Sequence, residues 1–120
     1  MNLKYSFYTS VITTYLPAIG KIKVDICTLP CEIISKKPFF AKSLVSNESY
    51  EGFKSDRKGW SKFEKTKDTF FYQRVYEIES CDILKAEKIF LPLIKKELSF
   101  KLFFHPKYKK ALCKKIEKLI

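Results

Sequence analysis

Apolar and polar residues alternate most regularly between residues 21 and 29, in the segment KIKVDICTL. Ile22, Val24 and Ile26 are separated by charged residues, and a period of two places these three side chains on one face of a strand. The segment therefore predicts a half-buried β-strand, and Pro30 is expected to end it.

The uncharged segment before it, residues 5–20, is rich in Thr, Val, Ile and Tyr, which favour strands. Tyr8, Ile12 and Leu16 also fit the spacing of a helix, which stays the alternative for this segment. A turn is predicted between the two segments by Pro17 and Gly20, so that together they form a hairpin.

Patterning is less regular in the middle of the chain. Residues 31–45 fit a short strand followed by one or two helical turns after Pro38. Residues 46–68 combine two glycines with many charged side chains and predict loop or irregular structure. Residues 69–79, TFFYQRVYEIE, are dense in aromatic and β-branched residues and predict a long strand.

From Asp82 onward the apolar residues recur with the period of a helix, with lysines on the other side. Pro92 lies inside this pattern and should kink the helix or split it in two. We expect a last short strand in SFKLFFH, residues 99–105. Pro106 should then open a further helix that runs to the C-terminus, because a first helical position tolerates proline.

Strands followed by helices predict an α+β fold in a single domain, residues 1–120. We expect an antiparallel sheet of about three to five strands, packed against the C-terminal helices. Neither helix would be stable alone in water, so packing against the sheet must stabilise both.

The charge of the chain is unevenly distributed. Its formal net charge is +11, and residues 85–120, with eleven basic and three acidic side chains, carry +8 of it, whereas residues 51–84 are neutral. A localised excess of this kind can steer an anionic partner. Lysine supplies the basic residues except Arg57 and Arg74, although specific readers of phosphate and guanine rely on arginine.

On the closing helix the lysines form one stripe opposite an apolar face. The candidates for partner contact in this stripe are Lys107, Lys110, Lys114 and Lys118. A solvated surface is the simpler use of such a stripe. A membrane contact is not expected, because the apolar face of the helix is needed for the core.

Residues 52–67 interleave aromatic and basic side chains, as single-stranded nucleic-acid binders do. The candidates for partner contact here are Lys54, Arg57, Lys58, Trp60 and Lys62. The simpler interpretation is that the rings anchor a long loop to the sheet.

The four cysteines, Cys27, Cys31, Cys81 and Cys113, favour structural thiols over metal ligands, since C-x3-C is not a usual zinc spacing. No metal or cofactor is predicted. The N-terminal segment lacks the leucine- or alanine-rich centre of a signal peptide, so we expect a cytoplasmic protein.

Catalytic chemistry has little support in the sequence. His105, the one histidine, is the only candidate base, and nothing matches a nucleophile elbow, a phosphate-binding loop or a zinc-protease motif. A metal-independent nuclease that uses His105, a lysine and Tyr108 remains as an alternative.

The hypothesis that leads is a small non-catalytic protein that acts stoichiometrically on a macromolecule, as inhibitors, immunity proteins, antitoxins and adaptors do. Its partner would be a protein with an acidic face. The first alternative is a nucleic-acid-binding domain that uses lysine–phosphate contacts. The main objection to an immunity protein is electrostatic, because a basic inhibitor would be repelled by a cationic nuclease.

Overall fold

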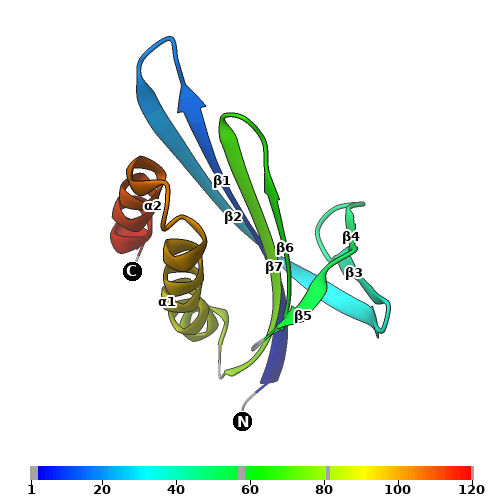
Figure 1. The fold of residues 1–120 in the computed structure, drawn as a ribbon. Helices are drawn as coiled ribbons and strands as arrows, with labels where there is room; N and C mark the ends of the chain where they lie inside the picture. The colour runs from blue at the N-terminus through cyan, green and yellow to red at the C-terminus, as the bar shows by residue number, and fades with distance from the viewer. Residues whose placement is uncertain (1–2, 57–58, 81, 120) are drawn as a thin grey trace.

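The computed structural model describes residues 3–56, 59–80 and 82–119. Within these ranges, one antiparallel sheet of seven strands precedes two helices (Figure 1). The strands are β1 (Leu3–Leu16), β2 (Lys21–Lys36), β3 (Phe39–Ser43), β4 (Ser49–Glu51), β5 (Lys54–Asp56), β6 (Gly59–Lys65) and β7 (Thr69–Ser80), and the helices are α1 (Ile83–Lys101) and α2 (Pro106–Leu119). The predicted α+β class is confirmed, but the expectation of about three to five strands was too low.

β1 and β2 form the expected hairpin, with Val11 opposite Ile26. Gly20 ends the turn at φ 64° and its N–H donates to the carbonyl of Leu16 at 2.8 Å. A positive φ is readily adopted by glycine. The prediction that Pro30 ends the strand is wrong, since β2 continues through it.

The segments around β3 to β6 depart from the predictions. The helical turns expected after Pro38 are absent from this described segment, because Phe39, Ala41 and Ser43 alternate inward in β3, which pairs with β2. Residues 46–68, expected to be irregular, contain β4, β5 and β6. β4 and β5 have three residues each, too few to reveal a period of two in the sequence.

The strand order is β4-β3-β2-β1-β7-β6-β5, so β4 and β5 lie at opposite edges of the sheet although only Gly52 and Phe53 separate them in the chain. Since neighbouring strands lie about 4.8 Å apart, the edges of a flat sheet of this size would be roughly 29 Å apart. The link between the two strands can span about 11 Å at most. The sheet must therefore curl, and Figure 1 shows the resulting half-barrel.

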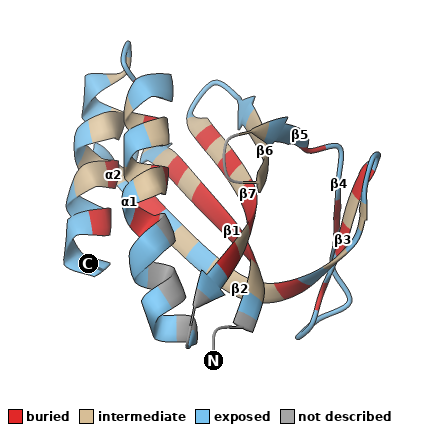
Figure 2. Cartoon of the chain, turned by 90° about the horizontal axis from the view of Figure 1, so that it is seen from below, coloured by how far each residue is buried: buried red, intermediate tan, exposed pale blue. Residues whose placement is uncertain are grey.

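Buried apolar side chains form two clusters on opposite faces of the sheet. The helix-side cluster consists of Phe7, Val11, Val24, Phe70, Tyr72, Tyr76, Ile78, Leu91, Ile94, Leu98, Leu102, Leu112 and Ile116. The curl-side cluster consists of Tyr8, Cys31, Phe39, Ala41, Tyr50, Phe53 and Val75. Successive residues of β1 and β7 contribute to different clusters, so these central strands are covered on both faces (Figure 2).

Asp82 is the N-cap of α1, because its carboxylate accepts from the backbone N–H of Lys85 at 2.8 Å. Pro92 lies inside this single helix and does not split it. The short strand expected at residues 99–105 is wrong, since this segment is the last turn of α1 and its connection to α2. Neither described helix is both long and apolar enough to cross a membrane.

Candidate binding surface

α2 has a buried face and a cationic face. Leu112 and Ile116 are fully buried in the helix-side cluster. The four lysines of the predicted stripe, which we name the lysine row, are all exposed: Lys107, Lys110, Lys114 and Lys118. Glu117, the one acid in α2, lies 2.9 Å from Nζ of Lys95 on α1.

None of the ion pairs among the side chains that the structure describes involves the lysine row. Its positive charge is therefore available to an external anion. A row of ammonium groups on a rigid helix suits contacts with carboxylates or phosphates.

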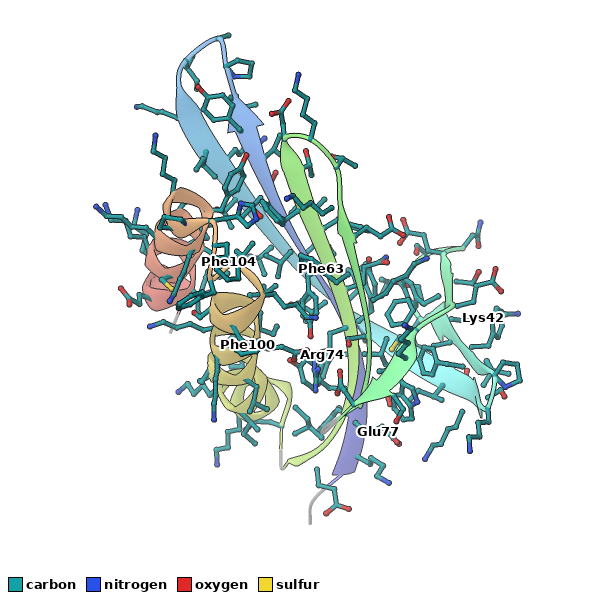
Figure 3. The ribbon with its side chains drawn as sticks, viewed as in Figure 1. Lys42, Phe63, Arg74, Glu77, Phe100 and Phe104 are labelled. Atoms are coloured by element: carbon teal, nitrogen blue, oxygen red, sulfur yellow. The ribbon has the colours of Figure 1, made fainter. Side chains whose placement is uncertain are left out.

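Three phenylalanines are exposed around the connection between α1 and α2, and we name them the aromatic turn: Phe100 in the last turn of α1, and Phe103 and Phe104 in the connection itself. Their exposed fractions are 84%, 65% and 85%. Leu102, in contrast, is buried and its N–H donates to the carbonyl of Leu98 at 2.8 Å, which anchors the turn to the core. Figure 3 labels Phe100 and Phe104 beside the helices.

The aromatic turn and the lysine row are neighbours along the chain, because α2 begins two residues after Phe104. The rings of Phe103 and Phe104 pack edge to face, with centroids 5.1 Å apart, and Lys109 Nζ lies 6.0 Å from the Phe103 centroid. At roughly 200 Å² per ring, the three side chains expose on the order of 450 Å² of apolar surface. A patch of this size often marks an interaction site.

The second predicted contact region lies elsewhere. Trp60, in β6, is half-buried and stacks on Phe39 with centroids 4.9 Å apart, so it belongs to the curl side of the sheet, opposite the helices. Lys62 is 3.4 Å from the carboxylate of Glu64, and Lys54 is exposed in β5. Arg57 and Lys58 lie outside the described residues. The sheet therefore separates Trp60 from the lysine row.

His105 lies at the start of α2, as expected. Its Nε2 is 3.4 Å from Nζ of Lys65, and its ring centroid is 6.3 Å from that of Tyr108. The fold thus gathers the three residue types of the nuclease alternative. Burial raises the pKa of Tyr108.

A polar cluster that was not predicted from the sequence lies on the helix side of the sheet. Arg74 of β7 is 2% exposed, and its Nη1 donates to Asp56 of β5 at 2.5 Å and to Glu97 of α1 at 2.7 Å. The same atom donates to the hydroxyl of Tyr72 at 3.2 Å, and burial raises the pKa of this phenol. Arg74 therefore ties three elements together.

A signal for this cluster was present in the sequence. Phe70, Tyr72, Tyr76 and Ile78 share one face of β7 at a period of two, and Arg74 occupies the middle of that face. A charge on a buried strand face requires an opposite charge nearby. The sequence could predict that requirement but could not identify Asp56 and Glu97 as the partners.

Thiols and other metal-binding groups are dispersed in the described part of the chain. Cys31 is buried, Cys113 is half-buried 3.7 Å from the hydroxyl of Ser99, and Cys27 is exposed. Cys81 lies outside the described residues. Within those residues, no group of three or more His, Cys, Asp or Glu could hold a metal ion.

Comparisons with protein-family models, curated proteins and solved structures found no match. The geometry of the chain itself must therefore support any assignment of function.

Proposed function

We propose that this chain is a non-catalytic binding protein that acts stoichiometrically on a protein with an acidic surface, as inhibitors, immunity proteins, antitoxins and adaptors do. The lysine row contacts the acidic surface, and the aromatic turn inserts into an apolar recess beside it. The observation that supports the proposal is that exposed lysines outside the described ion pairs follow directly in the chain on three exposed phenylalanines.

This combination matches the anatomy of protein interfaces. A few apolar or aromatic anchors supply most of the binding energy, and a charged rim around them sets orientation and association rate. The core of α2 remains intact in the complex, because Leu112 and Ile116 pack inward and the lysine row points outward. No folding step has to accompany binding.

Single-stranded nucleic acid is the second candidate, because exposed rings beside lysines also suit stacked bases. Two observations favour a protein. Phe103 and Phe104 pack edge to face, which covers part of a ring face that a base would need. Trp60, the ring expected to stack on a base, stacks on Phe39 instead.

Affinity capture with the purified chain from an extract of the source cells tests the proposal. Four variants are compared with the wild type. The lysine-row variant combines Lys107→Gln, Lys110→Gln, Lys114→Gln and Lys118→Gln, the aromatic-turn variant combines Phe103→Ser and Phe104→Ser, and a third variant carries both sets. In the control, four exposed lysines of β2, β3 and their loop are changed to glutamine: Lys21, Lys23, Lys37 and Lys42. The control loses the same charge from a different surface.

We expect one acidic protein to be recovered at a ratio near one to one by the wild type and the control. The lysine-row variant and the aromatic-turn variant should each reduce its affinity at least tenfold, which corresponds to about 1.4 kcal/mol. Equal recovery by all variants would overturn the proposal. Recovery of nucleic acid with a steep salt dependence would favour the second candidate, and binding to anionic phospholipid vesicles that needs Phe103 and Phe104 would assign the turn to a lipid surface.

A further inference from the structure

A cleft of about 520 Å³ lies between α1 and the β5–β7 part of the sheet. It is lined by Asp56, Arg74, Leu93, Lys96, Glu97, Phe100 and Lys101. Its volume is in the range of small-molecule sites. Figure 3 labels Arg74 on the sheet side of this region and Phe100 on the helix side.

The floor of the cleft is polar and held in place. Arg74 is bonded to carboxylates on two different elements, at 2.5 Å to Asp56 and 2.7 Å to Glu97. Its guanidinium also lies 4.5 Å from the ring centroid of Tyr76. Two negative charges and one positive charge leave the floor with a net charge of −1, and Lys96 and Lys101 bring the charge of the lining to +1. Because Nη1 of Arg74 already bonds to both carboxylates, the floor is formed before any ligand arrives.

The wall and the rim of the cleft come from one face of α1. Leu93 and Phe100 form an apolar wall, and Phe100 leaves 84% of its surface exposed. Lys96 and Lys101 are exposed at the rim, and neither takes part in an ion pair among the described side chains. Nζ of Lys101 lies 5.1 Å from the ring centroid of Phe63, which holds it over the sheet side.

We propose that this cleft binds a small amphipathic anion, a molecule with one carboxylate or phosphate group on an alkyl or aryl body. The anionic group binds between Lys96 and Lys101, and the apolar body covers Leu93 and Phe100. A cationic ligand would face the two rim lysines, while the floor carboxylates are engaged with Arg74. An anion without an apolar body would leave the wall exposed and gain only screened charge contacts.

The cleft is independent of the proposed protein interface except for Phe100, which borders both. A test based on Lys96 and Lys101 therefore separates the two proposals. The variant Lys96→Gln with Lys101→Gln removes the rim charges, and both side chains are exposed, so the fold should be retained. The matched control is Lys107→Gln with Lys110→Gln, which removes the same charge from the lysine row.

Isothermal titration calorimetry with four probes below their micelle concentrations tests the inference: octyl phosphate, octylamine, octyl glucoside and inorganic phosphate. We expect octyl phosphate to bind most tightly, and the rim variant to weaken it about five- to tenfold while the control leaves it unchanged. Phe100→Ala should also lower the affinity of the cleft for octyl phosphate. Any of three results would overturn the proposal. Octyl phosphate does not bind the wild type, octylamine or inorganic phosphate binds as tightly as octyl phosphate, or the rim variant binds octyl phosphate with unchanged affinity.

Discussion

The Arg74 cluster allows the sharpest prediction about stability, because one buried cation serves two carboxylates. Arg74 is 3% exposed, against 24% for Asp56 and 30% for Glu97, counted on side chains. A hydrogen bond to a charged group contributes about 1.5–3 kcal/mol, and a neutral one about 0.5–1.5 kcal/mol. Glu97→Gln keeps an acceptor but loses the charge, so it should destabilise the fold by about 1–2 kcal/mol.

Removing the guanidinium of Arg74 should destabilise the fold more than Glu97→Gln does. Arg74→Met leaves two carboxylates near each other without their counterion, and loss of one partner from a buried pair costs about 3–5 kcal/mol. Partial exposure of the carboxylates favours the lower end, about 3 kcal/mol. In the Arg74→Met background, Glu97→Gln should then be neutral or stabilising, because it removes an uncompensated charge.

Urea unfolding at pH 7, followed by the fluorescence of Trp60, measures these effects, since Trp60 is the one tryptophan. In thermal unfolding of the same variants, each 1 kcal/mol of lost stability should lower the melting temperature by about 3–4 °C. Glu64→Gln, which breaks the exposed Lys62–Glu64 pair, is the control and should change stability by less than about 0.5 kcal/mol. Equal destabilisation of both backgrounds by Glu97→Gln would mean that the interaction between Arg74 and Glu97 contributes nothing to stability, contrary to this prediction.

Three further predictions concern packing and titration. Leu112→Ala should destabilise the protein by about 3 kcal/mol in the same urea assay, and Leu119→Ala, at 51% exposure, by less than about 1 kcal/mol; similar values would contradict the burial of this face of α2. Gly59→Ala should cost at least about 3 kcal/mol, because its Cβ would lie 2.0 Å from the carbonyl oxygen of Val75, and a tolerated substitution there would disprove the close approach of β6 and β7. Burial raises the pKa of the Cys31 thiol to about 12, so the folded state retains a proton that the unfolded thiol releases near pH 9. Stability should therefore fall as pH rises from 9 towards 12, and it should fall less steeply in Cys31→Ala. An equal slope in both proteins would refute this linkage.

Periodic segments with one buried face were predictable from the sequence. The alternation of Ile22, Val24 and Ile26 identified β2, and the spacing of Leu112 and Ile116 identified the inward face of α2. In both cases a local repeat is enough to define the element, whatever packs against it.

Features that depend on distant contacts were not predictable in this way. β5 exists because its three residues pair with β6, and nothing within them signals a strand. The segment SFKLFFH has the composition of a strand, but Leu98 and Leu102 bury at helical spacing and leave Phe103 and Phe104 exposed. Arg74 indicated that a buried counterion was needed, but Asp56 and Glu97 reach it from 18 and 23 residues away.

The pairing of β1 with β7 has a consequence for the nascent chain. Phe7 lies opposite Tyr76, so β1 leaves the ribosome well before β7, the strand that fills its second edge. Until then the β1–β2 hairpin offers an open, aromatic-rich edge to other chains, and late long-range pairing of this kind is slow. A chaperone that recognises extended apolar segments would find its target in this early hairpin, before either helix has been synthesised.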